Sequence, residues 1–263
     1  RVAPSSSKRF PASFRFGIIR SQPLQTFSDE GFDKAYEEAI HRLEKLGGKA
    51  VTIDYQPFRD TAELLYGGPW VSERVSAIEP FDKEHEDSLH PVLKTILRKA
   101  EAYRATDVFH AEHQLAALQQ KTKPVWSEID VLLTPTASRI FTIEEVEANP
   151  IALNTELGFY TNFVNLLDLS AVALPAGFGE NQLPFGISLV APAWSDEKLS
   201  VLGEAFRQRT DLQLGATKFS LQGSSPFIQH TSNDAVHVAV VGAHLSGQPR
   251  NYQLTERGGV LLK

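Results

Sequence analysis

Hydrophobic positions near the start of the chain change from the continuous pattern of a strand to the spacing of a helix and back again. Apolar residues dominate 14–19, recur at intervals of three and four over 32–46, and fill 50–53. Those intervals place apolar side chains on one face of a helix, which Gly47-Gly48 is suited to end. This order predicts a βαβ unit whose two strands run parallel.

Further along the chain, helical patterns alternate with short runs of apolar residues. The helical pattern over 58–78 is interrupted at Gly67-Gly68-Pro69, where the proline suits the first turn of a new helix. The remaining predicted helices cover residues 104–121, 143–147, 157–167 and 195–207, and the remaining predicted strands cover residues 131–135, 171–174 and 186–190. Together these elements predict an α/β fold with a mixed β-sheet flanked by helices.

A polar stretch punctuated by glycine and proline separates the last residues from the rest. Residues 221–235 are typical of a linker, and 236–241 predict a new strand. We therefore expect one domain over 1–220 and the start of a second, small α/β domain over 236–263. The chain begins at Arg1 in a loop-like stretch, has no methionine, and stops soon after that strand. We expect a truncated product rather than a processed or tagged one.

Composition argues against several classes of protein. The net charge is −6 with acids and bases interspersed, unlike the clustered basic face of a nucleic-acid-binding protein. No apolar stretch approaches the roughly 20 residues that span a bilayer, and no signal peptide opens the chain. The absence of cysteine removes disulfides, thiolate nucleophiles and cysteine metal ligands. We expect no membrane or nucleic-acid partner and a cytoplasmic location, with which a cysteine-free chain is compatible.

Two Ser-x-x-Lys patterns could pair a nucleophilic serine with a lysine base. They lie at Ser5–Lys8 and Ser195–Lys198. A serine needs such a base because its hydroxyl is almost never ionised at neutral pH. However, Ser5 lies in a terminal loop, and Ser195 precedes a predicted helix whose first N–H groups its hydroxyl is suited to cap. Neither pattern is therefore assigned a catalytic role.

Two further patterns suggest a metal site and a phosphate site. His110 and His113 flank Glu112 on a predicted helix, but a zinc site would need a third ligand and a water position. We interpret them as part of an exposed helix face. Gly242 and Gly247 follow a predicted strand at the spacing of a phosphate loop, but no lysine follows, so nucleotide binding is rejected.

Tyr66 and Arg74 flank the predicted helix break and form the polar pair most suited to bind a ligand. On an unbroken helix their separation would span about 12 Å, too far for both to touch one small molecule. The break lets the second segment fold back so that both side chains converge. An arginine fork and a phenol suit a small carboxylate. The alternative is a surface pair of Glu73 with Arg74, beside a half-buried structural tyrosine.

Four stretches resemble, in the family order, the amidase-signature hydrolases, and their residues are most similar to those of the allophanate hydrolase branch. They cover residues 64–74, 131–135, 160–169 and 183–190. The resemblance implies amide cleavage by a serine nucleophile with a bridging serine on a cis peptide, a lysine, and an oxyanion hole of backbone N–H groups. The lysine-bearing strand and Gly-Ser-rich segment that carry those groups are absent here. We assign no catalytic residue in this chain and expect it to be inactive alone.

The same resemblance assigns the substrate pocket. The family's Tyr-x-Gly-Pro-Trp-x-x-x-Arg stretch matches Tyr66 and Arg74, which implies that these residues hold the substrate carboxylate. The implied reaction is the hydrolysis of allophanate, a urea that carries a carboxylate, to ammonia and carbon dioxide. It needs no metal or organic cofactor. The implied pathway partner is urea carboxylase. Homodimers are common in this family, although the sequence carries no signal for one.

Residues 238–254 resemble the opening of the C-terminal domain of long allophanate hydrolases, which is similar to γ-glutamylcyclotransferase-like folds. The resemblance implies that this domain decarboxylates the N-carboxycarbamate left after deamination. The resemblance makes His244 a candidate to donate a proton or orient a carboxylate. The alternative is a histidine that stabilises a turn.

The sequence is also compatible with two other functions. One is amide hydrolysis by an amidase-signature enzyme with a different acyl substrate. The other is a non-catalytic binding or assembly module that never had a nucleophile.

Overall fold

The computed structural model describes residues 12–20, 30–180, 182–213, 215, 217, 219, 240 and 242–260. By its internal contacts the chain divides into two compact units, residues 1–221 and 222–263, which are described separately. The predicted linker over 221–235 and nearly all of the predicted strand over 236–241 lie outside the described residues.

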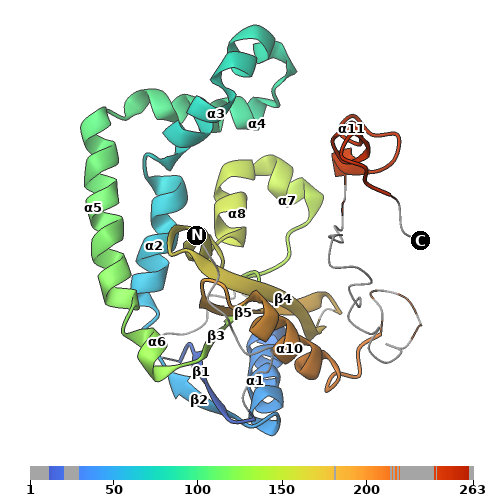
Figure 1. Ribbon diagram of the computed structural model, residues 1–263. Coiled ribbons are helices and arrows are strands. Elements are labelled where there is room, and N and C mark those ends of the chain that lie inside the picture. Colours follow the sequence, from blue (N-terminus) through green and yellow to red (C-terminus); the bar gives the residue numbers. More distant parts are fainter. Residues whose placement is uncertain are drawn as a thin grey trace. The chain divides into compact units, whose positions relative to one another are not determined.

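The first unit is built on a five-stranded mixed sheet (Figure 1) with the order β2-β1-β3-β5-β4. Its strands are β1 (Phe14–Ile18), β2 (Gly48–Thr52), β3 (Val131–Pro135), β4 (Leu169–Phe178) and β5 (Pro184–Pro192). Strand β1 runs parallel to β2 and β3, whereas β5 runs antiparallel to β3 and β4. Helix α1 (Glu30–Lys45) connects β1 to β2. The predicted βαβ unit and mixed sheet are both confirmed.

The remaining helices of this unit follow the sequence pattern in most places. They are α2 (Gln56–Gly67), α3 (Trp70–His85), α4 (Pro91–Arg98), α5 (Ala105–Thr122), α6 (Val125–Glu128), α7 (Ile143–Ala148), α8 (Pro150–Leu157), α9 (Asn162–Leu166) and α10 (Asp196–Arg207), with 3-10 turns η1 (Glu86–Ser88) and η2 (Lys99–Ala102). In the second unit the structure has η3 (Gly242–His244) and α11 (Tyr252–Thr255).

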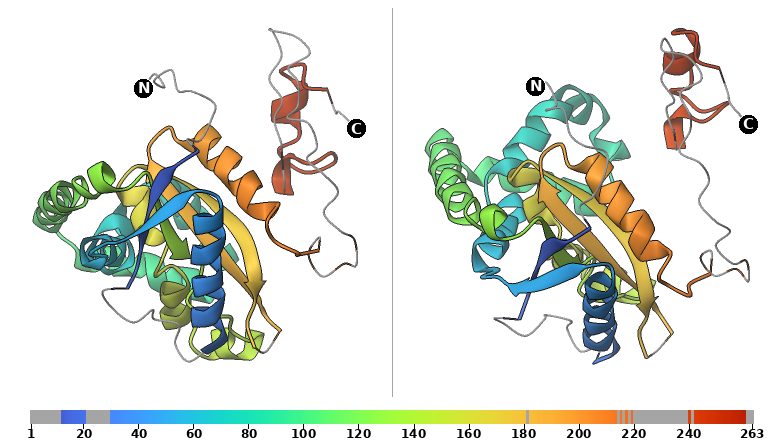
Figure 2. Two further views of the ribbon diagram at one scale, coloured as in Figure 1. Left: turned by 90° about the horizontal axis from the view of Figure 1, so that it is seen from below. Right: turned by 60° about the horizontal axis from the view of Figure 1, so that its bottom comes forward.

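Two hydrophobic clusters cover the two faces of the sheet. The first joins the sheet to α1 and α10 through buried residues that include Phe16, Phe32, Ile40 and Phe206. The second joins the opposite face to α2 and α9, and Figure 2 shows α1 and α10 on one side with α2 and α5 on the other. Both faces of the sheet bury apolar side chains away from water, and this burial stabilises the packing of the sheet between two layers of helices.

The predicted helix over 157–167 is wrong in its first half. Helix α8 ends at Leu157, a turn follows, and α9 begins at Asn162. A Cβ at Gly158 would lie 2.4 Å from the Asn162 side-chain amide, which occupies the space beside this glycine in the turn. The turn buries Tyr160 in the second cluster, and this tertiary burial outweighs the helical period.

The predicted strand over 171–174 is too short. Strand β4 extends from Leu169 to Phe178 because it pairs with β5 along almost its whole length, with an irregularity between Pro175 and Gly177. The prediction ended before Pro175 and Gly177, two residue types that disfavour the interior of a strand, whereas pairing with β5 carries β4 past them.

Candidate functional site

The break between α2 and α3 forms where it was predicted. Helix α2 ends at Gly67, and the Gly68 N–H donates to the Leu64 carbonyl oxygen at 3.0 Å. Helix α3 begins at Trp70, and the Ser72 N–H donates to the Pro69 carbonyl oxygen at 2.8 Å. We call residues 67–69 the elbow. A Cβ at Gly68 would lie 2.6 Å from the Leu64 oxygen, so this position requires glycine.

The elbow brings Tyr66 and Arg74 into contact. The Arg74 guanidinium carbon lies 4.8 Å from the centre of the Tyr66 ring, which is the geometry of a cation–π contact. Tyr66 is 41% exposed and Arg74 is exposed as well, so both polar groups face solvent from one small region. Their spatial convergence follows the expectation from sequence, whereas their role in binding a carboxylate stays a prediction.

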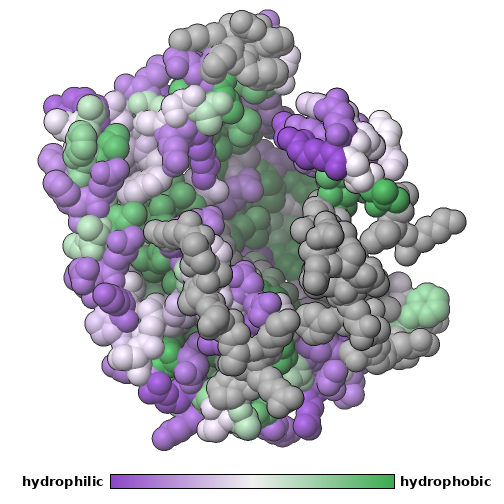
Figure 3. Space-filling model, viewed as in Figure 1, coloured by the Kyte–Doolittle hydropathy of each residue, from purple (hydrophilic) through white to green (hydrophobic). Residues whose placement is uncertain are grey.

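The surface of the first unit is hollowed near these helices. Figure 3 shows a recess over α7 and α8, below α3 and α4, whose floor combines apolar and polar residues. Contacts between α4 and α8 join the two sides of this region. The recess brings residues from distant parts of the sequence to one surface.

An ion network that sequence reasoning missed follows the carboxyl end of β3. The Arg139 Nε donates to Glu156 at 3.2 Å, and its Nη1 lies 3.7 Å from Glu145. The guanidinium also lies 4.2 Å from the centre of the Phe141 ring. A hydrogen bond from the Thr142 backbone N–H holds the pKa of Glu145 below its ordinary value. The sequence signal that could have indicated Arg139 is its place shortly after a buried strand, because polar residues that follow a strand often line a site.

Several hydroxyl groups of the sheet region and the second cluster are buried or partly buried. The hydroxyl of Thr136, the residue after β3, lies 3.0 Å from the Ser188 hydroxyl on β5. The Thr134 and Tyr55 hydroxyls are buried and have no hydrogen-bond partner among the residues that the structure describes. Burial raises the pKa of Tyr55 well above its ordinary value, so this phenol stays protonated at neutral pH.

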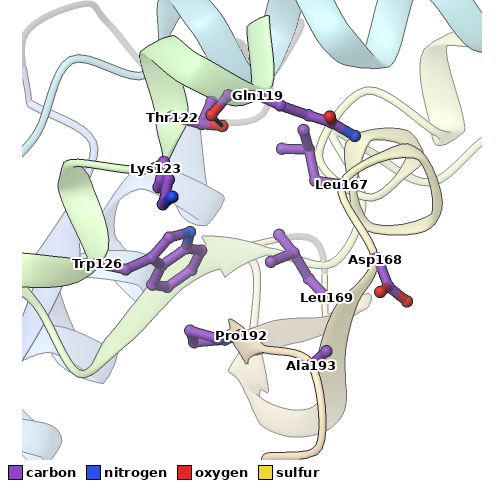
Figure 4. A pocket seen from close by; sticks show the side chains of 9 residues that line it. All are labelled: Gln119, Thr122, Lys123, Trp126, Leu167, Asp168, Leu169, Pro192 and Ala193. Carbon is purple, nitrogen blue, oxygen red and sulfur yellow. Dashed lines mark hydrogen bonds between the residues drawn. The ribbon is translucent and has the colours of Figure 1, made fainter. Parts of the chain in front are cut away.

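A separate pocket of about 260 Å³ lies at the start of β4 and the end of β5. Its lining, drawn in Figure 4, consists of Gln119, Thr122, Lys123, Trp126, Leu167, Asp168, Leu169, Pro192 and Ala193. The Asp168 side chain points away from the middle of the pocket, so its centre is mainly apolar with Lys123 at one side. Neither Tyr66 nor Arg74 lines it, so this pocket is distinct from the predicted carboxylate site.

Ser195 lies at the N-cap of α10, but its predicted capping bond is absent. Instead, its backbone N–H donates to the Ser170 hydroxyl at 3.1 Å, and that hydroxyl donates to Asp196 at 3.0 Å. The cap prediction was therefore wrong, and Ser195 is joined to β4 through its backbone N–H instead. Ser5 and Lys8 lie outside the described residues.

The structure places the predicted histidines in different surroundings. His110 and His113 are exposed on α5, and the described part of the chain has no group of three or more histidine or acidic side chains suited to a metal. In the second unit, His244 Nε2 lies 3.1 Å from Gln253 Oε1, and its carbonyl oxygen accepts from the Asn251 amide at 2.9 Å. His244 belongs to η3, so its ring is held by a local turn.

No helix within the described ranges is both long and apolar enough to cross a membrane.

Comparisons with known proteins agree on one family. The model of the family described as "Amidase" matches residues 2–200. Urea amidolyase of Lachancea kluyveri is 37% identical over 269 residues, which cover 97% of this chain and 14% of the relative. Urea amidolyase of Saccharomyces cerevisiae is 34% identical, with 94% of this chain and 14% of the relative covered.

Solved structures give the same result. Allophanate hydrolase of Kluyveromyces lactis superposes with a TM-score of 0.76 at 32% identity, which covers 97% of this chain and 43% of that chain. The K. lactis urea amidolyase superposes with a TM-score of 0.78 at 31% identity, over 97% of this chain and 16% of that one. The chain thus spans less than half the length of each of these four relatives.

Proposed function

Because this chain belongs to the amidase family, we propose that it is part of an amide hydrolase that acts on allophanate and that it supplies the pocket for the substrate carboxylate. Hydrolysis of the terminal amide would release ammonia and leave N-carboxycarbamate, whose decarboxylation releases carbon dioxide. Similarity to urea amidolyases and to an allophanate hydrolase over nearly the whole chain supports this choice of substrate.

The contact between Arg74 and Tyr66 carries the proposal. The Arg74 guanidinium lies over the Tyr66 ring and is exposed, so the N–H groups that face solvent can bind a carboxylate with two parallel hydrogen bonds. The Tyr66 hydroxyl can add a third bond to the same anion. Each hydrogen bond to a charged group contributes about 1.5–3 kcal/mol.

This pair also accounts for discrimination between allophanate and urea. Urea has no carboxylate, so its binding would leave the arginine without its anionic partner. A site built to bind one polar group rejects an analogue that lacks it, because the site's own polar groups stay unpaired. Both side chains are partly exposed here, which would reduce the energetic difference through solvent screening.

In this proposal the nucleophilic serine, the bridging serine and the lysine come from a part of the protein outside these residues, and no metal or organic cofactor takes part. The 263-residue chain alone would therefore bind the substrate carboxylate without cleaving the amide. The complete protein would take its substrate from urea carboxylase, which makes allophanate from urea. The proposed setting is the cytoplasm.

His244 is proposed for the second step. The hydrogen bond between His244 Nε2 and Gln253 Oε1 favours the tautomer that carries its proton on Nε2, because an amide oxygen only accepts. The other ring nitrogen would then be free to accept a proton or to orient the carboxylate of N-carboxycarbamate. Residues 236–263 would be the start of the domain that completes this site.

The binding test uses malonamate, which keeps the amide and carboxylate of allophanate but replaces the central N–H by a methylene. We expect calorimetry to show binding to the 263-residue chain and a roughly 10- to 100-fold loss of affinity in Arg74→Gln. Arg59→Gln is the matched control, because the Arg59 guanidinium carbon also lies over an aromatic ring, 5.3 Å from the centre of Phe159, but away from the elbow. Equal affinity in wild type and Arg74→Gln would contradict the pocket.

Activity assays separate the remaining alternatives. The complete protein should hydrolyse allophanate and malonamate far faster than simple neutral amides, whereas an amidase for another acyl group would prefer the neutral amides. Ammonia release from allophanate by the 263-residue chain alone would contradict its proposed role. A non-catalytic module would release no ammonia even as the complete protein, and its coding sequence would lack a lysine strand and a Gly-Ser-rich segment upstream.

A further inference from the structure

We propose that Tyr103 is a positioning residue that fixes the elbow between α2 and α3 and so sets the spacing of Tyr66 and Arg74. The Tyr103 hydroxyl donates to the Gly67 carbonyl oxygen at 3.2 Å, across 36 residues of sequence. The consequence for ligand binding rests on the proposed function, whereas the effect on geometry does not. Tyr103 touches no reacting group and would act only through the elbow.

Tyr103 is itself held on both sides. Its backbone N–H donates to the Ala100 carbonyl oxygen at 3.1 Å, which closes η2. The next residue, Arg104, donates its backbone N–H to the Asp107 carboxylate at 2.7 Å, and the Asp107 N–H returns a bond to the Arg104 carbonyl oxygen at 2.9 Å. The phenol therefore projects from a fixed junction at the start of α5.

The group that Tyr103 binds lies at the point where the chain turns. Gly67 is the last residue of α2, and the last carbonyl groups of a helix have no partner within it. Gly67 and Gly68 also have the greatest backbone freedom of any residues in this segment. The tyrosine holds the Gly67 carbonyl and so restricts rotation at the two glycines. Tyr66 precedes this point and Arg74 follows it, so the restriction sets their relative position.

Without this bond we expect α3 to sample more orientations relative to α2. In some of them Arg74 would leave the ring face of Tyr66. The affinity of a site falls by the fraction of time in which its binding-competent arrangement is populated. Loss of the hydroxyl should therefore weaken binding of an anion that needs both side chains, and leave binding that needs neither unchanged.

The geometric test is independent of any ligand. The Tyr66 ring current should shift the NMR resonance of the Arg74 Nε–H. The variant Tyr66→Leu has no aromatic ring at this position, so the resonance whose shift it abolishes is that of Arg74. We expect Tyr103→Phe to move this resonance towards its position in Tyr66→Leu. Tyr252→Phe, which removes an exposed phenol from the other unit, should leave it in place. An unchanged resonance in Tyr103→Phe would overturn the inference.

The binding test compares malonamate with malonamide, its neutral analogue. We expect Tyr103→Phe to weaken malonamate binding roughly three- to tenfold, the value of one net hydrogen bond, and to leave malonamide binding unchanged. The loss should vanish in the Arg74→Gln background. If malonamate binding depends on Arg74 but has the same affinity in Tyr103→Phe, the inference about Tyr103 is overturned and the proposed function stands. If malonamate binding does not depend on Arg74, the proposed function is overturned. The NMR resonance of the Arg74 Nε–H would then still test whether Tyr103 holds the elbow.

Discussion

The Tyr36 hydroxyl donates a hydrogen bond of 2.9 Å to the backbone carbonyl oxygen of Leu133, 97 residues further along the chain. The same hydroxyl accepts from the Ile19 backbone N–H at 3.3 Å. One phenol on α1 therefore satisfies backbone groups of β3 and of the residue after β1. It joins the βαβ unit to the centre of the sheet from within the buried core.

Tyr36→Phe should lower the free energy of unfolding by about 1–3 kcal/mol, because it leaves a buried N–H and a buried carbonyl group without this partner. Urea denaturation followed by circular dichroism measures the change. Tyr55→Phe is the matched control, since the Tyr55 hydroxyl is also buried but has no partner among the described residues. It should be neutral or slightly stabilising. Equal losses in the two variants would show that the Tyr36 bonds contribute nothing specific.

The free energy of unfolding should fall as the pH rises above about 10. Burial raises the pKa of both Tyr36 and Tyr55 above the ordinary value of 10.0, so both stay protonated in the folded state while they ionise in the unfolded chain. The stability that they contribute is complete below pH 10 and is lost above it. Each phenol adds a slope of about 1.4 kcal/mol per pH unit.

Denaturation series between pH 8 and pH 11 measure this slope. The double variant Tyr36→Phe/Tyr55→Phe should have a shallower slope than the wild type above pH 10, whatever its stability at pH 8. The same slope in both proteins would mean that other groups cause the alkaline loss.

Thr134→Val and Thr136→Val should have opposite outcomes although both replace a hydroxyl by a methyl group. The Thr134 hydroxyl is buried without a partner among the described residues, so its removal should be neutral or stabilising. The Thr136 hydroxyl lies 3.0 Å from the Ser188 hydroxyl, and its removal should cost about 1 kcal/mol. Thermal unfolding of the two variants gives the comparison, and a larger loss in Thr134→Val would reveal a partner for that hydroxyl.

Gly68→Ala should disturb the elbow, whereas Gly67→Ala should not. A Cβ at Gly68 would lie 2.6 Å from the Leu64 carbonyl oxygen, which is backbone and cannot move aside without loss of the helix end. We expect a loss of roughly 1–3 kcal/mol, with a weaker contact between Tyr66 and Arg74. Nothing lies within 4 Å of a Cβ at Gly67, so alanine is tolerated there. Thermal unfolding checks the stability, and the Arg74 resonance checks the contact.

Much of the fold could be predicted because its signals are local. The spacing of Ala39, Ile40 and Leu43 marks the buried face of α1, and the structure buries all three completely. The elbow at Gly67-Gly68-Pro69 was equally visible, since glycine and proline act through their own backbones. The predicted helix over 157–167 failed because Tyr160 is buried against other elements in the second cluster.

The residues of the candidate site likewise include some that the sequence indicated and some that only the structure revealed. Residue types and places beside the break singled out Tyr66 and Arg74, and only the resemblance to the family's Tyr-x-Gly-Pro-Trp-x-x-x-Arg stretch favoured a binding role over a structural one. Tyr103, Arg139 and Glu156 could not be chosen from the sequence, because each acts on a partner 17 or 36 residues away and no local period connects them.

By itself the sequence determined the family, the parallel βαβ unit and the two residues proposed to bind the carboxylate. These depend on the residues of short motifs and on the spacing of hydrophobic positions, which are properties of neighbouring positions. Only the tertiary structure decided that the guanidinium of Arg74 lies over the Tyr66 ring and that a phenol from the start of α5 holds the turn between them. The physical reason is that helix packing sets distances between residues that are remote in sequence.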